Sequence, residues 1–529
     1  MKRTLLPALL LFLAAMAPVG AETVTGTTGD DFTPPFETGT GFVPKNAIDA
    51  CVLAGLARAG IEPANPCSDA VFLRRVYVDL LGTLPDPSEV RRFQDDDSPD
   101  RRARLIDRLL ERDEFVDYWT LKWSDLLRVK AEFPINLWPN GVQAYYRWIH
   151  DAVRDNMPYD AFARTLLTSS GSNFRAAPVN FYRAVPSETP SSIAAAAALT
   201  FMGTRLETWP EKERKNLEAF FSRVAFKKTA EWKEEIIYLD PAPTGTIRTA
   251  FPGGTPVEIA PEEDPRRVFT DWLLEPGNPW FARSIANRVW SWFLGRGIVH
   301  EPDDIRPDNP PSNPALLLSL ETELVRSGYD LRQLFRFILN SRTYQGSSIP
   351  RSSDPRGEAL FASYLVRRLD AEVLSDALGR LDGSGVTYAS AVPEPFTILP
   401  NLKRSIRLKD GTITSPFLLL FGRPSRDTGR ESERDNEPTE GQRLYLLNSR
   451  EVQRRIERSP WLRRLVGSAR RDPRRLINAL YVAVLARDPT PREMMQAASY
   501  LGGKGRNIRE AASDLTWALL NSKEFLYRH

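Results

Sequence analysis

The chain has 529 residues, 42% of them apolar, and its 71 Lys and Arg residues nearly balance its 68 Asp and Glu residues. This length is enough for several hydrophobic cores, and the apolar fraction is too high for a disordered chain. The formal charge of +3 leaves no large field of one sign. Such a field is what wrapping a nucleic acid or binding a membrane through a polybasic segment requires, so we expect no nucleic-acid partner.

The first 21 residues have the pattern of a secretory signal peptide. Lys2 and Arg3 precede an apolar segment over residues 5–19, and small residues end the pattern at Ala21. The apolar segment is too short to span a bilayer, and no cysteine follows the cleavage site, so we expect no membrane anchor after cleavage. The sequence therefore predicts an exported protein of the periplasm, the cell envelope or the extracellular space.

Residues 22–44 are rich in Thr, Gly and Pro and have no apolar periodicity, which predicts a linker. Cys51 and Cys67 follow, with Pro63 and Pro66 between them to turn the chain. In an oxidising compartment this spacing favours a disulfide, which contributes about 3 kcal/mol for a loop of this size. Two buried free thiols are the alternative.

Helical periodicity dominates residues 45–235, which we predict to be a first helical domain. Leu73, Val76, Tyr77, Leu80 and Leu81 form one apolar stripe, and Gly82 ends it. Further apolar stripes lie at 105–110, 119–127, 145–153, 162–167, 193–202 and 217–226.

The pattern changes at residue 236. Short β-prone runs broken by Pro and Gly predict a β-containing insert over residues 236–262. Helical periodicity returns over residues 263–529, the predicted second helical domain, with another strand- or loop-rich insert at about 387–420. The predicted fold class is therefore mainly α, with two multi-helical domains and small β-containing inserts.

One short sequence motif occurs three times. Leu-Asn-Ser followed by Arg or Lys lies at residues 339–342, 447–450 and 520–523. Its unequal spacing excludes a solenoid repeat. Asn and Ser after an apolar helix are typical of a junction that ends one helix and caps the next.

Few residues are available for catalysis. The chain has three histidines, and it lacks the zinc-protease, nucleophile-elbow, phosphate-loop and dinucleotide-binding motifs. The densest polar segment, residues 302–311, contains Asp303, Asp304 and Asp308 together with Arg306 and Asn309. These carboxylates could bind a hard cation or supply an acid/base pair for a glycan. An Arg–carboxylate network that holds a Pro-rich loop is the favoured alternative, because neighbouring carboxylates without a predicted cleft are common.

The tryptophans also have two interpretations. Trp119, Trp123 and Trp292 lie on apolar stripes, where we expect them to fill the core. The remaining candidates for an exposed carbohydrate platform lie at polar or Pro-flanked positions: Trp138, Trp209, Trp232 and Trp280. For the set as a whole a core position is favoured.

Two groups of motifs carry a family resemblance. The first group lies at residues 72–82, 105–110, 119–128 and 158–162. It resembles the cytochrome-c-associated planctomycete domain, a domain of unknown function in exported planctomycete-type proteins. The second group resembles the C-terminal partner domain of the same proteins, and it lies at residues 286–290, 295–299, 303–306, 309–312, 341–345, 421–424, 446–448 and 519–525.

The resemblance covers nearly all of residues 45–529, and no biochemical activity is assigned to the family. It implies that certain motif residues form a structural network in both this chain and its relatives. These residues are Asn287, Arg288, Trp290, Arg306 and Asn309.

The chain departs from these relatives at two places. Many relatives carry a Cys-x-x-Cys-His haem-attachment motif between a Phe-Leu-Gly helix end and a Trp, but only residues 204–208 separate Gly203 from Trp209 here, without Cys or His. Covalent haem needs two cysteines and an axial histidine, so we expect no haem and no other cofactor. Relatives also show a Cys-x-Cys-Glu-Arg motif, where this chain has residues 430–434 without sulfur. We interpret the two losses as independent.

These features favour an exported, haem-free, non-catalytic protein that binds a partner protein or a surface polysaccharide. The resemblance implies an exported sulfatase-like protein as the partner, because family members often accompany such proteins. The alternative is a carboxylate-dependent hydrolase that acts on complex or sulfated glycans through Asp303, Asp304 or Asp308. An electron-transfer protein is a second alternative, which the missing haem motif disfavours.

Overall fold

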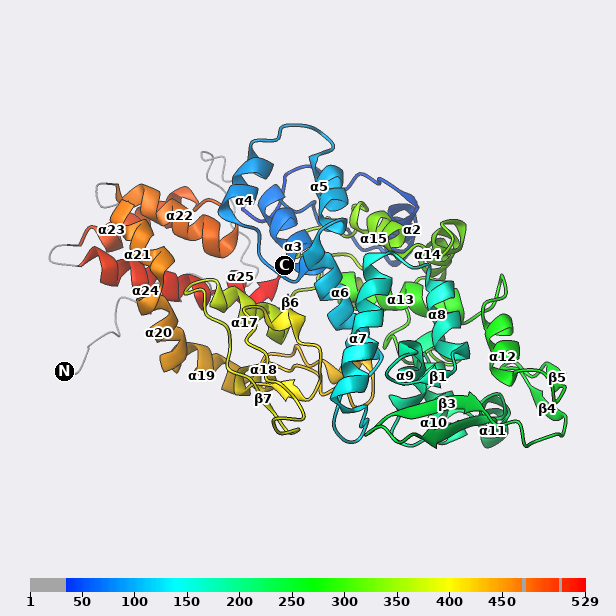
Figure 1. Cartoon of the computed structure of the whole chain (residues 1–529). Coiled ribbons are helices and arrows are strands. Elements are labelled where there is room, and N and C mark those ends of the chain that lie inside the picture. Colours follow the sequence, from blue (N-terminus) through cyan, green and yellow to red (C-terminus); the bar gives the residue numbers. More distant parts are fainter. Residues whose placement is uncertain (1–34, 469–471, 504–506) are drawn as a thin grey trace. The chain divides into compact units, whose positions relative to one another are not determined.

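The computed structural model describes residues 35–468, 472–503 and 507–529 (Figure 1). The predicted signal peptide and the predicted linker up to residue 34 lie outside the described residues. Residues 35–529 form one compact unit. Within it, residues at the end of the predicted linker are held in place: Ser68 Oγ donates to the carbonyl oxygen of Pro35 at 2.7 Å, and Glu37 forms a β-bridge with Cys67.

The first half of the described chain is mostly helical. Its helices are α2 (Ala47–Ala59), α3 (Asp69–Leu81), α4 (Pro87–Gln94), α5 (Arg101–Leu110), α6 (Asp113–Leu126), α7 (Trp138–Arg154), α8 (Tyr159–Thr168), α9 (Asn180–Arg183), α10 (Pro190–Ala197) and α11 (Glu211–Ala219). Short helical segments lie at η1 (Ala177–Val179), η2 (Ala198–Met202) and η3 (Leu206–Thr208).

The ends of the first helices follow from local chemistry. Ser68 caps α3, and Gly82 ends it with a φ of 57°, a left-handed conformation that favours glycine. A side chain at Gly82 would also meet the ring of Tyr118 at 2.5 Å. Asp86 opens α4 in a capping box with Glu89. The predicted helix end at Gly82 is therefore confirmed.

Three short strands pair beside this helical half. β1 (Gly171–Ser172), β3 (Glu235–Leu239) and β2 (Val224–Lys228) form an antiparallel sheet in this order, and β4 (Ile247–Ala250) pairs with β5 (Pro256–Ile259). β2 lies partly inside the stretch 217–226 that the periodicity predicts as helix. The helix stops at Ala219 because residues from Val224 onward bond to β3, so tertiary pairing overrides the local pattern.

The second half is again helical. It contains α12 (Pro265–Leu273), α13 (Phe281–Leu294), α14 (Pro314–Arg326), α15 (Leu331–Leu339), α16 (Arg356–Ala359), α17 (Ala371–Gly379), α18 (Pro416–Leu420), α19 (Glu440–Asn448), α20 (Arg450–Arg458), α21 (Pro460–Ser468), α22 (Pro473–Leu485), α23 (Pro491–Leu501), α24 (Ile508–Leu520) and α25 (Lys523–Leu526). Short turns lie at η4 (Ser405–Arg407) and η5 (Glu431–Glu433).

Two minimal sheets complete the fold. β6 (Arg367–Arg368) pairs with β9 (Tyr527–Arg528), and β7 (Ala389–Ser390) pairs with β8 (Ile413–Thr414). The mainly α fold with small β-containing inserts is thereby confirmed. Within the described ranges, no helix combines the length and the apolar character needed to cross a bilayer.

The repeated Leu-Asn-Ser motif joins two helices at two of its three occurrences, as predicted, whereas after α15 no helix follows directly. After α24, Asn521 Nδ2 donates to the carbonyl oxygen of Trp517, and Ser522 Oγ accepts from the backbone N–H of Phe525 in α25. Ser449 caps α20 in the same way directly after α19. Asn340 bonds back to Arg336 at the end of α15.

Packed aromatic side chains in the core join the two halves of the chain. Trp119 and Trp123 of α6 are 2% and 4% exposed. The ring of Trp119 lies 5.4 Å from the ring of Trp292 on α13 and 4.3 Å from that of Phe335 on α15. The predicted core tryptophans are confirmed. The boundaries of the two predicted domains stay predictions, because their helices pack around this common core.

The predicted disulfide is wrong, because Cys51 and Cys67 are both free cysteines in the structure. Cys51 lies on α2, and its carbonyl oxygen accepts a hydrogen bond from Asn313 Nδ2 beside α14. Cys67 is buried elsewhere, where Arg102 and Gln345 bond to its backbone. The two residues are therefore held by different neighbours, and the intervening prolines do not bring their sulfur atoms together.

Candidate functional site

The three predicted carboxylates lie in one loop after α13 but have different surroundings. Asp303 is fully buried; its Oδ1 lies 2.7 Å from Arg288 Nη1, and its Oδ2 accepts from the backbone N–H of Glu431 at 2.6 Å. Asp304 and Asp308 both pair with Arg306, each at 3.1 Å. Each carboxylate already has a cationic partner. These contacts support the Arg–carboxylate network, and they leave no free acid/base pair.

The other motif residues also hold this region together. Asn287 exchanges two hydrogen bonds of 2.9 Å with the backbone of Val299. Asn309 Nδ2 donates to the carbonyl oxygens of His300 and Asp304 at 3.0 and 2.9 Å. Arg288 also donates to the carbonyl oxygen of Leu199 at 3.1 Å. Trp290 is fully buried, and its ring lies 5.0 Å from that of Phe361.

The two hydrogen bonds between Asn287 and Val299, which we call the Asn287 clamp, give a prediction for the free energy of unfolding. We expect Asn287→Ala to lower the free energy of unfolding by about 2–3 kcal/mol, because it leaves a buried N–H and a buried carbonyl of Val299 without partners. Urea unfolding followed by circular dichroism measures this change. The exposed Asn140→Ala variant is the control, with a change within about 0.5 kcal/mol. Equal effects of the two substitutions would show that the clamp does not hold the loop.

Three loops meet at this place, namely residues 203–209, 300–309 and 428–434. The carbonyl oxygen of Gly203 accepts from the backbone N–H of Ile305 at 2.9 Å, and Arg205 pairs with Glu301 at 2.6 Å. Glu207 forms an ion pair with Arg430. The two segments in which the chain departs from its relatives therefore contact each other. That the two losses are independent stays a prediction; the structure adds that both segments lie at one place in the fold.

Residues 203–209 do not fit a covalently attached haem. They include no Cys or His, and their polar side chains have protein partners. Trp209 Nε1 donates to Thr204 Oγ1 at 3.1 Å, while Arg205 and Glu207 form the ion pairs described above. Among the described residues, no group of three or more His, Cys, Asp or Glu side chains is arranged to hold a metal ion.

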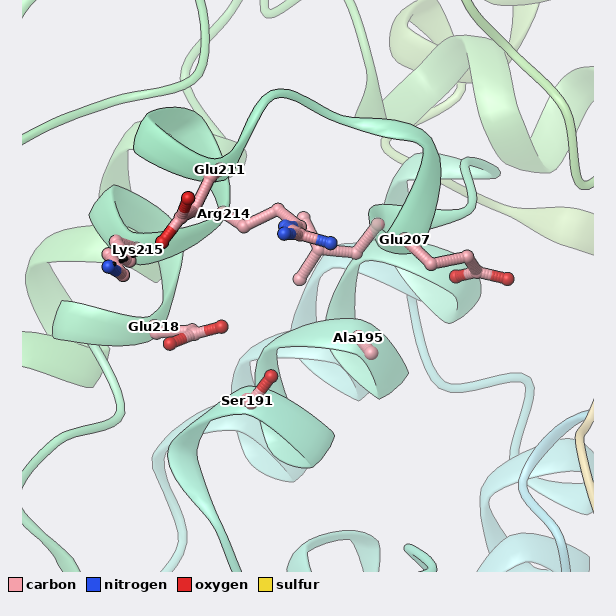
Figure 2. A pocket seen from close by; sticks show the side chains of 8 residues that line it. Ser191, Ala195, Glu207, Glu211, Arg214, Lys215 and Glu218 are labelled. Carbon is pink, nitrogen blue, oxygen red and sulfur yellow. Dashed lines mark ion pairs between the residues drawn. The ribbon is translucent and has the colours of Figure 1, made fainter.

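An open groove of about 320 Å³ borders the same loop (Figure 2). It lies between α10 and α11, which pack against each other, with η3 along one side. Its lining combines small, apolar and charged side chains: Ser191, Ala195, Leu206, Glu207, Glu211, Arg214, Lys215 and Glu218.

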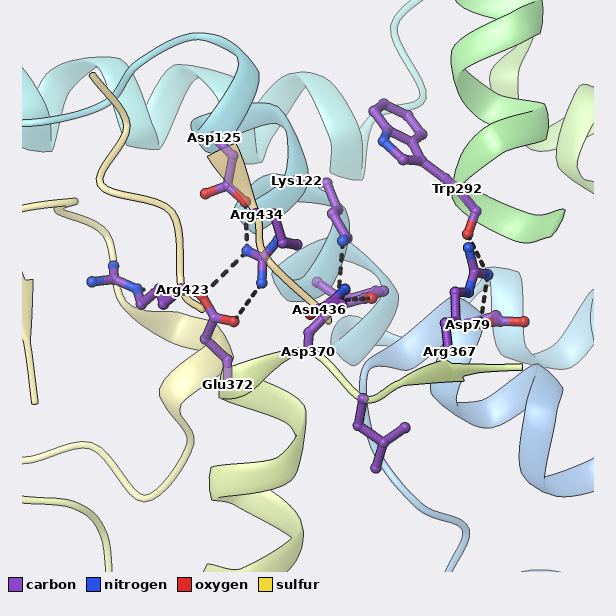
Figure 3. A network of polar contacts seen from close by, with 12 residues as sticks. Asp79, Lys122, Asp125, Trp292, Arg367, Asp370, Glu372, Arg423, Arg434 and Asn436 are labelled. Atoms are coloured by element: carbon purple, nitrogen blue, oxygen red, sulfur yellow. Dashed lines mark hydrogen bonds and ion pairs between the residues drawn. The ribbon is translucent and has the colours of Figure 1, made fainter. Parts of the chain in front are cut away.

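A buried ionic network adjoins the 428–434 loop (Figure 3). Asp370, 1% exposed, accepts from Tyr118 at 2.8 Å and from Asn436 at 2.9 Å, and it pairs with Lys122 at 3.0 Å and Arg528 at 2.9 Å. Burial alone would raise the pKa of Asp370, but the charges of Arg528 and Lys122 outweigh it and hold the pKa well below its ordinary value. Burial lowers the pKa of Lys122.

The network continues into the 428–434 loop. Arg434 joins Glu372 at 2.7 Å and Asp125 at 2.6 Å, and Arg426 also pairs with Asp125 at 2.8 Å. The network borders a cavity of about 20 Å³ beside Lys122. This volume holds about one water molecule, which is too small for an organic ligand. The network therefore acts as a polar core that connects α6, α17 and the loop.

An exposed aromatic cluster lies where three further segments meet. The ring of Trp138, at the start of α7, lies 6.3 Å from that of Trp232 and 5.7 Å from that of Phe396. Trp232 is 64% exposed and Phe396 54% exposed. Lys233 Nζ lies 5.2 and 5.6 Å from the ring centroids of Trp138 and Trp232. We call these four residues the aromatic cluster.

The sequence predicted only part of this cluster. Trp138 and Trp232 are candidates for exposed rings, but nothing in the sequence pairs them or points to Phe396, which lies in the segment between β7 and η4. The other two candidates, Trp209 and Trp280, form a separate pair with ring centroids 5.6 Å apart. Both are partly buried.

Two family models match the chain. Residues 47–225 match PSCyt2, a protein of unknown function (DUF1549), and residues 265–501 match PSD1, a protein of unknown function (DUF1553). Neither the comparison with curated proteins nor that with solved structures gave a match.

Proposed function

This chain belongs to the planctomycete-type family that pairs the DUF1549 and DUF1553 domains of unknown function, and from that premise we propose that it is an exported, haem-free protein that binds an acidic surface polysaccharide without cleaving it. The observation that carries this proposal is the aromatic cluster. Export rests on the pattern of residues 1–21, and the absence of haem rests on residues 204–208, which contain neither Cys nor His.

The aromatic cluster has the chemistry of a sugar platform. Trp232 lies in the turn between β2 and β3 and keeps most of its ring in water, although burial of apolar surface is favourable by about 25 cal/mol per Å². The C–H groups of a pyranose ring pack against such an aromatic face. Trp138 lies next to this ring and Phe396 lies next to Trp138, so several sugar units of one chain can contact the surface.

The charge of Lys233 favours an acidic polysaccharide. Its ammonium group lies beside two rings, and it has no carboxylate partner within the described part of the chain. A carboxylate or sulfate on a sugar that rests on Trp232 would supply the missing partner. A neutral sugar would gain only the stacking contact.

The backbone around the cluster is strained. Trp138 has a φ of 64° and Lys233 a φ of 63°, in the left-handed region that side chains other than glycine rarely adopt. Strain of this kind costs on the order of 1–3 kcal/mol and gathers at functional sites. Two strained residues in one exposed cluster therefore support a binding role for it.

The contacts of the acidic loop support the non-catalytic part of the proposal. A hydrolase needs one free carboxylate and one carboxylic acid that face the same bond. Asp303 is fully buried and pairs with Arg288, and Asp304 and Asp308 both pair with Arg306. Each of the three carboxylates therefore has an arginine partner, and the one that is mostly exposed, Asp308, shares its arginine with Asp304.

Removal of the Trp232 ring tests the platform. We expect Trp232→Ala to weaken binding to a uronic-acid or sulfated polysaccharide about tenfold, equivalent to about 1.4 kcal/mol, in affinity gel electrophoresis. Met495→Ala, which truncates a 67% exposed side chain on α23, should leave binding unchanged. Lys233→Gln should reduce the preference for acidic over neutral polysaccharide, whereas the exposed Lys523→Gln should not.

Two results would contradict the proposal. In the first, Trp232→Ala and Met495→Ala bind as the unaltered chain does. In the second, the unaltered chain binds no polysaccharide and instead purifies from its own host with an exported sulfatase-like protein, which would favour the partner-protein alternative.

A further inference from the structure

The groove of Figure 2 contains two kinds of charged side chain. Glu211 and Lys215 pair with each other at 2.6 Å, and Glu207 pairs with Arg430, so these charges are already neutralised. The side chains of Arg214 and Glu218 make no hydrogen bond or ion pair with any described residue. Both are partly buried. Among the described residues of the groove, Arg214 and Glu218 are thus the cation and the anion without a close ion-pair partner, although Lys215 also attracts Glu218 from further away.

These two charges are one helical turn apart on α11, yet they do not pair. An acid placed four residues before a base pairs better than the reverse order, which is why Glu211–Lys215 forms and Arg214–Glu218 does not. In Figure 2 the Arg214 side chain extends across the groove towards Glu207, while the Glu218 carboxylate lies above α10. The free charges thus lie at different positions along the groove.

We propose that this groove binds a short zwitterionic peptide of two or three residues. Arg214 binds the terminal carboxylate through its planar guanidinium, a geometry that matches a carboxylate. Glu218 binds the terminal ammonium group. Ala195 and Leu206 supply the apolar surface for a small side chain, and the Ser191 hydroxyl is available to the peptide backbone.

The size of the groove agrees with such a ligand. Side chains four residues apart on a helix begin about 5–6 Å from each other, and an extended peptide spans about 3.3–3.6 Å per residue. The two side chains therefore leave α11 at a spacing comparable to that of one or two residues of an extended peptide. A volume of about 320 Å³ is at the lower end of the range for small-molecule sites. This site is separate from the aromatic cluster and does not depend on polysaccharide binding.

Titration of the purified chain with alanyl-alanine, followed by calorimetry and NMR, tests the proposal. We expect saturable binding, at least tenfold weaker binding for Arg214→Gln and for Glu218→Gln, and an unchanged affinity for Lys212→Gln, an exposed residue of α11 outside the groove. Amidation of the peptide carboxylate should weaken binding to the unaltered chain but not to Arg214→Gln. Acetylation of the amino group should behave in the same way with Glu218→Gln.

A variant that reduces the volume of the groove without changing its charge gives a second test of peptide binding. Ala195→Leu fills the floor of the groove and should abolish peptide binding while the thermal unfolding midpoint and the polysaccharide affinity stay unchanged. The proposal is overturned if no binding of alanyl-alanine is measurable, if the blocked peptides bind as tightly as the free one, or if Ala195→Leu binds normally.

Discussion

Asp370→Asn is expected to lower the free energy of unfolding by about 3–5 kcal/mol. The substitution removes the negative charge that Lys122 and Arg528 share at 3.0 and 2.9 Å in a site closed to solvent. Breaking a buried ion pair at one partner leaves the other charge buried without compensation, and the cost comes mainly from this unpaired charge. Arg528 keeps Asp79 as a partner at 3.0 Å, so the cost falls mainly on Lys122, for which Asp370 is the strongest opposing charge to burial.

Urea unfolding of the purified chain measures this effect. The matched control is Asp155→Asn, which removes an exposed carboxylate paired with Arg154 at 3.0 Å. Exposed pairs contribute about 0–1 kcal/mol, so the control should change little. A cost for Asp370→Asn within 1 kcal/mol of the control would mean that the network of Figure 3 does not stabilise the fold.

A second large effect concerns Asp376 and pH. Burial between α17 and η4 raises the pKa of Asp376 to about 7, although the backbone N–H groups of Ser405 and Ile406 donate to its carboxylate and act in the opposite direction. Below about pH 4 both the folded and the unfolded chain carry the proton. Between pH 4 and 7 only the folded chain retains it, so this contribution to stability is lost as the pH rises through about 7.

Asp376→Asn should remove this pH dependence. Asn keeps only one of the two acceptor atoms, so the variant should be the less stable chain at pH 4. The difference in unfolding free energy should then move in favour of the variant by on the order of 4 kcal/mol between pH 4 and pH 8. Asp155→Asn supplies the background at each pH. A difference that stays constant from pH 4 to 8 would show that Asp376 is ionised in the folded chain at all these values.

Local chemistry predicted much of the fold. Gly82 and Asp86 mark helix boundaries that depend only on neighbouring residues, and Trp119 follows a helical stripe into the core. Strand β2 was missed because Val224 takes its conformation from pairing with Leu239, which local periodicity does not report. The predicted disulfide failed for a related reason, since neighbours distant in the sequence set the positions of Cys51 and Cys67.

Some features of the candidate site could also be predicted from the sequence, whereas others depend on contacts between distant segments. The density of charge at residues 303–309 indicated an Arg–carboxylate network. The residues that pair within this network are near each other in the sequence, except Arg288 and Glu431, which bind Asp303. The contact of Glu207 with Arg430 joins residues far apart in the chain, so only the folded structure reveals that the two departures from the family are one place. Phe396 has no signal in the sequence, because its neighbours in the aromatic cluster come from two other segments.

One measurement separates binding from cleavage. The purified chain is titrated with an acidic polysaccharide, and tryptophan fluorescence and newly formed reducing ends are recorded in the same samples. We predict a saturable fluorescence change that Trp232→Ala reduces, with no increase in reducing ends. Reducing ends that accumulate with the unaltered chain but not with Asp304→Asn or Asp308→Asn would contradict the account and establish the hydrolase instead.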